Sequence, residues 1–100
     1  MANPEPTLTN SLHAIVDPTR RRILHSLKQR GATSPGKKSA GLCAGDIEER
    51  VRLSQPTISH HMAILTRAGL VEAKKQGQWR WYRRNERAIR SLVKMLRAEL

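Results

Sequence analysis

Apolar side chains recur every three or four residues in five segments of the chain, a spacing typical of helices that bury one face. The first segment begins at Leu8, with Thr7 placed to cap the helix, and it breaks at Asp17 because the residue before a proline avoids the helical region. Proline is well suited to the first turn of a helix, so a second helix is expected from Pro18 to just before Gly31.

Three further helices are expected along the rest of the chain. A short helix covers about 44–51. A longer helix lies between Ser54, which is suited to cap it, and Gly69, which ends it. The last helix covers about 86–99, and its apolar residues form one stripe.

The pattern changes between the last two helices, where Val, Trp and Tyr favour strands. Residues 70–75 and 79–84 flank the tripeptide Gln76-Gly77-Gln78, and a glycine at such a tip favours a β-hairpin. Residues 31–41 contain Gly, Ser, Pro and Lys without an apolar period, which predicts a loop.

This order predicts a mainly α fold with a two-stranded β wing, in the sequence α-α-α-α-β-β-α. A tight connection at Arg52 and Leu53, followed by a helix that opens with polar residues, is typical of a helix-turn-helix. The hairpin directly after that unit makes the predicted fold a winged helix-turn-helix.

The charge of the chain indicates what kind of partner it has. Lys and Arg number 19 against 8 Asp and Glu, which gives a formal net charge of +11 over 100 residues. A chain of this length forms one domain and is too short for a (β/α)₈ barrel. The positive excess favours a polyanionic partner, double-stranded DNA first, with structured RNA or a merely solvated basic surface as alternatives.

The single cysteine, Cys43, excludes an intramolecular disulfide framework and a zinc site of four cysteines or of two cysteines and two histidines. The start of the chain lacks the basic and apolar regions of a signal peptide, and no stretch approaches the length of a membrane span. We therefore expect a soluble, cytoplasmic protein without a membrane partner. The chain also lacks a Gly-rich phosphate loop and a nucleophile elbow, so we do not expect an enzyme.

The helix after Ser54 is the predicted recognition helix, because its apolar stripe leaves short polar side chains on the other side. Ser, Thr and Gln can bond to base edges in the major groove, and the helix start offers free N–H groups to phosphate. The expected contacts of this helix with DNA are Ser54, Gln55, Thr57, Ser59, His60 and Arg67. The alternative is an ordinary solvated helix face, and Ile64 has to pack sideways or lie exposed.

Basic residues also crowd the predicted wing and the start of the second helix. Lys and Arg at such places can pair with phosphates or enter the minor groove. The expected contacts there are Lys74, Lys75, Gln78 and Arg80 on the wing and Arg20 on the second helix. The aromatic residues of the second strand are expected to pack in the core or at a dimer contact rather than to stack on bases. His61 is expected at the edge of the core, and no metal site is expected at His60 and His61, which point about 100° apart.

The first and last helices carry more apolar residues than one small core covers, which favours a two-fold dimer. The expected interface residues are Leu8, Leu12, Ile15, Val93, Leu96 and Leu100. Residues 1–7 are expected to be flexible, and 8–100 to form one DNA-binding domain whose terminal helices make the dimer interface. The alternative is a monomer in which both helices fold onto their own core.

Four segments together resemble the ArsR-type winged-helix transcriptional regulators of bacteria. They are the stretch 16–24 (VDPTRRRIL), the stretch 53–62 (LSQPTISHHM), the stretch 65–71 (LTRAGLV), and Gly77 followed by 79–83 (WRWYR). The resemblance covers about residues 8–98. It implies a homodimeric repressor that binds operator DNA, with two recognition helices about 34 Å apart on a pseudo-palindromic site.

The resemblance also bears on effectors. Metal sensors of this family often carry Cys-x-Cys in the third helix, whereas here Cys43 is followed two residues later by Gly45, and the last helix contains no histidine. The chain therefore resembles the metal-independent branch, whose members often repress their own operon, with no cofactor, no metal and an unknown effector. The alternatives are a thiol- or metal-responsive repressor that uses Cys43 and a non-specific nucleic-acid-binding protein.

Overall fold

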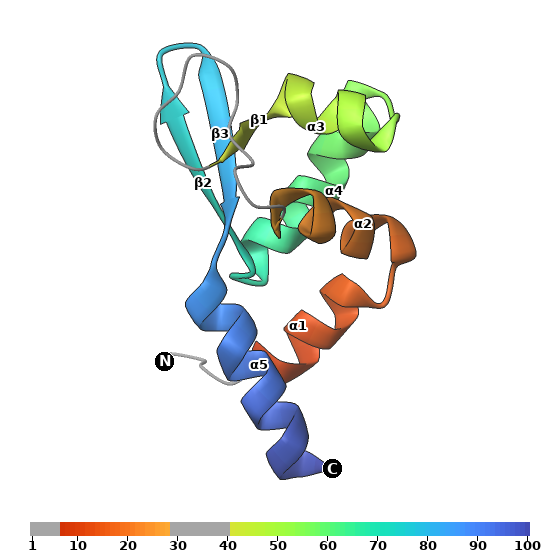
Figure 1. Cartoon of the computed structure of the whole chain (residues 1–100), viewed down its shortest axis with the longest axis vertical. Coiled ribbons are helices and arrows are strands. Elements are labelled where there is room, and N and C mark those ends of the chain that lie inside the picture. The colour runs from red at the N-terminus through yellow and green to blue at the C-terminus, as the bar shows by residue number, and fades with distance from the viewer. Residues whose placement is uncertain (1–6, 29–40) are drawn as a thin grey trace.

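Helices make up most of the fold, and a small antiparallel sheet precedes the last of them (Figure 1). The computed structural model describes residues 7–28 and 41–100. Within these ranges the elements follow in the order α1 (Thr7–Ile15), α2 (Pro18–Lys28), β1 (Leu42–Cys43), α3 (Ala44–Val51), α4 (Gln55–Arg67), β2 (Val71–Gln76), β3 (Trp79–Arg84) and α5 (Glu86–Glu99). The prediction of a mainly α winged helix-turn-helix with five helices is confirmed.

The sheet has one more strand than the sequence predicted. Its order is β1-β3-β2 and both pairings are antiparallel, so β1 lies on the far side of β3 from β2. Leu42 is opposite Tyr82 at this edge. The backbone of Gly41 has a φ of +146°, and a Cβ there would lie 3.0 Å from the carbonyl oxygen of Tyr82, so the entry into β1 requires glycine.

The hairpin of β2 and β3 turns more tightly than expected. Gln76 pairs with Trp79, which leaves Gly77 and Gln78 as a two-residue turn instead of a three-residue tip. Gly77 has a φ of +61°, the left-handed conformation that two-residue hairpin turns favour.

Of the two caps expected at helix starts, Thr7 is corrected and Ser54 is confirmed in its position but not in its hydrogen bond. Thr7 belongs to α1 and does not precede it as a cap. Ser54 occupies the cap position of α4, but its side chain makes no capping hydrogen bond and its Oγ instead lies 3.0 Å from Oγ1 of Thr57. Of the expected flexible segment 1–7 and the expected loop 31–41, residues 1–6 and 31–40 lie outside the described residues, whereas Thr7 begins α1 and Gly41 leads into β1.

The core contains side chains from every layer of the fold. Ile58, Met62 and Leu65 of α4 are buried, as their spacing predicted. The other buried hydrophobic residues are Ala14, Ile23, Leu42, Ile47, Val51, Leu70, Val71, Tyr82 and Leu92. Ile64 is half-buried and packs against this cluster, so it packs sideways.

Two sets of hydrogen bonds join the recognition helix to its neighbours. Arg52 adopts the left-handed conformation at φ 58°, and its amide donates to the carbonyl of Glu48 at 2.7 Å, which closes α3 and directs the chain into α4. Asn85 caps α5 by accepting from the amide of Ala88 at 3.1 Å, while its side-chain amide donates to the carbonyl of Gly69 at 3.0 Å. The end of α4 and the start of α5 are therefore joined.

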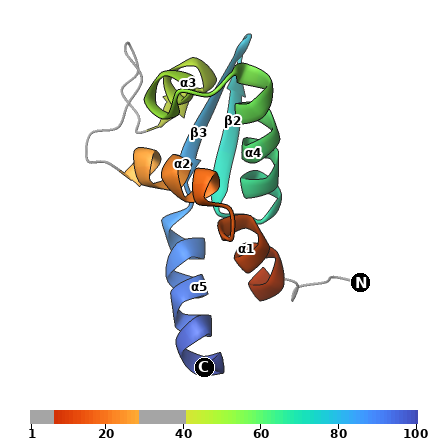
Figure 2. The ribbon, with the colours of Figure 1, turned by 90° about the vertical axis from the view of Figure 1, so that its right-hand side faces the viewer.

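Both views place the tip of the wing and α3 at one end of the molecule and the C-terminal end of α5 at the other (Figures 1 and 2). The helix α4 begins beside α3 and packs against β2. The start of α4 and the wing tip thus belong to the same end of a molecule 41 Å long. No helix in 7–28 or 41–100 has both the length and the apolar character to cross a membrane.

Candidate nucleic-acid interface

The outer face of α4 presents the side chains that the sequence singled out. Ile58, Met62 and Leu65 fasten the opposite face to the core, so the orientation of the helix is set by apolar packing. The exposed candidates on this helix and at its cap position are Ser54, Gln55, Thr57, Ser59, His60 and Arg67. The structure therefore places all six within reach of an external partner.

The first turn of α4 offers hydrogen-bonding groups in a compact arrangement. Pro56 has no N–H and stands in the first turn, where such a group would be unpaired in any case. The hydroxyls of Ser54 and Thr57 contact each other at 3.0 Å and are exposed. A phosphate or a base edge approaching the helix start would meet both hydroxyls together with the free amides of the turn.

The wing presents its free cations at the pairs nearest its tip. Lys75 pairs with Arg80 across the hairpin, Lys74 is opposite Trp81, and Gln78 lies in the turn. Lys74, Lys75, Gln78 and Arg80 are exposed, and the three cations have no ion-pair partner among the described residues.

Further from the tip the arginines have carboxylate partners. Arg83 is bonded to Glu72 at 2.8 Å, and Arg84 forms an ion pair with Glu86 at 2.9 Å. The free positive charge of the wing is therefore concentrated toward the tip.

Arg20 differs from its predicted role. Its side chain is only 7% exposed, and its Nε–H donates to the carbonyl of Ala14 at 2.6 Å. A second N–H group donates to the carbonyl of His13 at 3.3 Å, and a third nitrogen lies 3.1 Å from Nδ1 of His61. Because these groups bind α1 and α4, Arg20 joins elements of the fold and is not available to DNA. Its position three residues before the buried Ile23 was the signal in the sequence.

The two following arginines also contact backbone carbonyls but stay exposed. Arg21 donates to the carbonyls of Ile15 and Val16, and Arg22 donates to that of Val51 at 3.1 Å. These side chains could exchange a carbonyl for a phosphate at small cost, which Arg20 could not.

His61 lies at the edge of the core, as predicted, and titrates differently from a free histidine. Burial lowers its pKa below the usual 6.5, and the neighbouring charges of Arg20 and His60 lower it further, while Asp17 acts in the opposite direction. The neutral ring can accept the N–H of Arg20 at Nδ1, so the Arg20–His61 contact belongs to the unprotonated state.

The carboxyl group of Asp17 has a lowered pKa as well. Burial raises the pKa of this carboxyl group. Two effects lower it more: the amides of Thr19 and Arg20 donate hydrogen bonds to Oδ1 at 2.7 and 3.3 Å, and the guanidinium of Arg20 is positively charged. Asp17 therefore stays ionised at the start of α2, where the helix dipole favours a negative charge.

Cys43 stands at the cap position of α3, and its thiol contacts Oδ2 of Asp46 at 3.2 Å. Among residues 7–28 and 41–100 no group of three or more His, Cys, Asp and Glu side chains could hold a metal ion.

The expected dimer residues divide into two sets. Leu8, Ile15 and Leu96 are half-buried and pack on the chain's own core. Leu12, Val93 and Leu100 are 39%, 53% and 99% exposed. The helices α1 and α5 contact each other, so the exposed residues lie on neighbouring elements (Figure 1).

Two exposed hydrophobic residues were not among the candidates. Val16, which continues the stripe of the first helix, is 67% exposed. Trp79 is 55% exposed beside the wing turn, so of the two places expected for the aromatic residues, the core and a dimer contact, it does not lie in the core. Tyr82 on the same strand is buried and Trp81 is half-buried, as that expectation required.

Comparisons with known proteins identify the fold independently. Residues 17–73 match the family model "Bacterial regulatory protein, arsR family". The transcriptional repressor SdpR of Bacillus subtilis is 35% identical over 86 residues, which is 86% of this chain and 84% of that protein. An HTH-type transcriptional regulator of Methanocaldococcus jannaschii is 35% identical over 83 residues, which is 83% of each chain. The solved structure of an ArsR-like transcriptional regulator from a Rhodococcus species matches with a TM-score of 0.75 at 25% identity, over 93% of this chain and 78% of that chain.

Proposed function

The chain belongs to the ArsR family of bacterial DNA-binding transcriptional regulators, and from that membership we propose that it is a homodimeric repressor that binds a pseudo-palindromic operator. The observation that carries the proposal is the exposed polar face of α4 at the same end of the molecule as the free cations of the wing. One duplex can meet both surfaces at once. The Bacillus subtilis relative is named a repressor, which supports the direction of regulation.

In this proposal the start of α4 reads bases and the wing holds the backbone. Gln55, Thr57 and His60 are the base-reading residues, because their side chains are exposed and carry the donors and acceptors that base edges match. Lys75 and Arg80 pair with phosphate, since both charges are free and flank the turn. The supporting contacts are assigned to Ser54, Ser59, Arg67, Lys74 and Gln78.

The dimer is proposed to form through α1 and α5. Leu12 and Val93 support this surface because they are exposed hydrophobic residues on two helices that contact each other, and the exposed Val16 and Leu100 directly follow the ends of those helices. A two-fold axis there would present both recognition helices to one face of a duplex, about 34 Å apart. The operator is accordingly an inverted repeat with half-sites one helical turn apart, and the chain's own promoter is the first place to look for it.

We also propose that the effector is not a soft metal ion. The whole chain has one cysteine, α5 contains no histidine, and soft-metal sensing requires several thiolates. The contact of the Cys43 thiol with Asp46 supports a local role at the start of α3.

The test is a selection of bound sequences from a random DNA pool with the full chain. Enrichment of an inverted repeat with a spacing of about 10 base pairs supports the proposal. A pool that stays random while the protein binds every duplex would overturn it in favour of non-specific nucleic-acid binding. Preference for structured RNA over the selected duplex would have the same consequence.

Two variants then separate the assigned roles. Thr57→Ala should weaken binding to the selected site by about 1–3 kcal/mol while leaving binding to random duplex unchanged. Lys75→Ala should weaken binding to the selected site and to random duplex alike. It should also reduce the slope of log K against the logarithm of the salt concentration by about 0.9. The matched control is Lys94→Ala, an exposed lysine on α5, the helix whose C-terminal end lies opposite the wing tip, and this change should affect neither.

A third variant tests the dimer. Val93→Glu places a charge on the proposed interface and should convert the protein to a monomer in sedimentation, with a large loss of operator affinity. A wild-type chain that sediments as a monomer at the concentration where it binds the operator would refute the dimer.

A further inference from the structure

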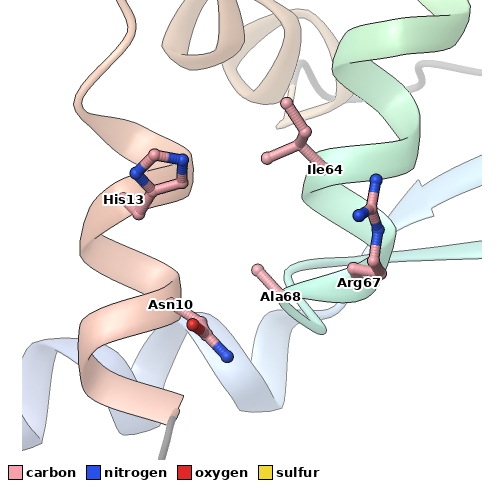
Figure 3. Close-up of a pocket in the computed structure, with 5 residues that line it drawn as sticks. All are labelled: Asn10, His13, Ile64, Arg67 and Ala68. Carbon is pink, nitrogen blue, oxygen red and sulfur yellow. The ribbon is translucent and has the colours of Figure 1, made fainter.

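A pocket of about 210 Å³ opens between α1 and the C-terminal half of the recognition helix α4. Asn10 and His13 line it from α1, Ile64 and Arg67 line it from α4, and Ala68 lines it from the cap position after α4 (Figure 3). Ile64 and Ala68 point toward α1, Asn10 extends from the side of α1 nearest Ala68, and the side chain of Arg67 runs along α4. The pocket thus has one apolar wall and a polar rim contributed by two helices.

The rim carries positive charge and hydrogen-bond donors, and the lining contains no acidic residue. Arg67 provides a guanidinium, Asn10 an amide and His13 an imidazole. Within the described ranges none of these three side chains makes a hydrogen bond or an ion pair, although the backbone carbonyl of His13 accepts from Arg20. Their bonding capacity is therefore free for a ligand.

We propose that this pocket binds a small organic carboxylate, with the anion on Arg67 and the apolar body against Ile64 and Ala68. A guanidinium presents paired N–H groups that match a carboxylate, and Asn10 and His13 can each donate one more hydrogen bond. The volume of about 210 Å³ suits a ligand the size of benzoate. An inorganic phosphate would leave the apolar wall uncovered, so the organic anion fits the lining better.

The pocket also lies where a ligand can influence DNA binding, and this step rests on the proposed function. Arg67 is the last residue of α4. It lies on the same exposed face as His60, which is two turns earlier in the helix. A bound carboxylate neutralises Arg67 and joins α4 to α1, so the guanidinium is withdrawn from phosphate. By linkage, the carboxylate lowers DNA affinity and DNA lowers carboxylate affinity by the same factor.

Ligand binding is measured without DNA, by titrating the ¹⁵N-labelled full chain with sodium benzoate against benzamide as the neutral probe of the same shape. Saturable shifts at the amides of residues 10, 13, 64, 67 and 68, with a dissociation constant of about 1 mM or tighter, are the expected result. Benzamide should bind at least tenfold more weakly. Arg67→Gln should weaken benzoate to the level of benzamide, and Arg87→Gln, an exposed arginine on α5, should leave its affinity unchanged.

Equal affinity for benzoate and benzamide, shifts spread over the whole basic surface, or no saturation would each overturn the carboxylate site. The regulatory step is tested with the selected operator at constant ionic strength, with benzoate replacing chloride. When benzoate replaces chloride, operator affinity should fall for the wild type and stay constant for Asn10→Ala. This variant removes a proposed ligand contact at a residue that has no assigned contact with DNA. An operator affinity of the wild type that does not change with benzoate would refute the linkage. If the selection yields no operator, the proposed function is refuted, and the ligand titration alone decides whether the pocket binds a carboxylate.

Discussion

Replacing Arg20 with methionine should destabilise the fold by about 3 kcal/mol. The side chain is almost fully buried and donates to the carbonyls of Ala14 and His13 in the last turn of α1. Those carbonyls have no partner further along α1, because the helix ends at Ile15. Arg20 therefore supplies, from α2, the hydrogen bonds that the end of α1 lacks.

The magnitude follows from the three contacts. The bond to Ala14 is short at 2.6 Å and charge-assisted, so about 2 kcal/mol is expected for it. The bond to His13 is long at 3.3 Å and the contact with His61 is 3.1 Å, and together they add a further 1–2 kcal/mol or so. Methionine preserves the packing of the aliphatic part of the side chain and removes the desolvation cost of the buried cation. The expected loss in the free energy of unfolding is therefore about 3 kcal/mol, below the largest sum of the three contacts.

The assay is urea unfolding followed by far-UV circular dichroism at one protein concentration, because the proposed dimer would be stabilised by mass action. With m of about 2 kcal/mol/M the midpoint should fall by roughly 1.5 M. Arg22→Met is the matched control, an exposed arginine on the same helix with one carbonyl contact, and should cost less than about 1 kcal/mol. If Arg20→Met and Arg22→Met unfold within about 0.5 kcal/mol of each other, Arg20 does not join α1 to the fold as inferred.

Three further changes test other joints of the structure. The free energy of unfolding should fall as the pH drops from about 6.5 through the lowered pKa of His61, because in that range the native state binds fewer protons than the unfolded chain. In His61→Gln the amide oxygen still accepts from an arginine but does not titrate. Unfolding curves taken across that range should therefore show a weaker dependence of stability on pH for this variant. Gly41→Ala should cost about 1–3 kcal/mol in thermal or urea unfolding because of its positive φ and its close approach to the sheet, whereas Gly45→Ala, with open space around it, should be neutral or stabilising. Asn85→Ala removes a cap and a bond to the end of α4 and should cost about 1–2 kcal/mol, and a loss no larger than that of a surface substitution would contradict the capping role.

The helices were predictable because their signal is local. The spacing of Ile58, Met62 and Leu65 identifies both the helix and its buried face, and the structure buries all three. The strand β1 was not predictable in this way. It has two residues, too few for a period, and it exists because Leu42 pairs with Tyr82, which is 40 positions further along the chain. Pairing over that distance leaves no pattern in the segment itself.

The candidate site was predictable in its outline and less so in its charges. The exposed face of α4 follows from the helical phase, so its residues could be assigned from the sequence. The basic residues could not be sorted by composition, because a buried arginine and an exposed one contribute equally to the net charge. Arg20 and Arg22 are two positions apart on one helix, and only the phase relative to the buried Ile23 distinguishes the one that joins the fold from the one that faces solvent.

The contacts around α4 differ in kind along its two sides, and this difference bears on regulation. Toward the sheet and the core the helix is held by Ile58, Met62 and Leu65, whose packing does not respond to pH or to small solutes. Toward α1 it is held by the contact of His61 with Arg20, which also binds the carbonyls at the end of α1. Nearer the end of α4, the pocket that Arg67 helps to line separates the two helices. Of these two sides, only the one toward α1 carries groups on which protonation or an anion can act. Because α1 also carries exposed hydrophobic residues of the proposed dimer surface, a change in the joint between α1 and α4 would alter how the two recognition helices are presented to an operator. A signal that regulates DNA binding is therefore expected to act at this joint, and variants there should change the response to the signal more than they change the affinity in its absence.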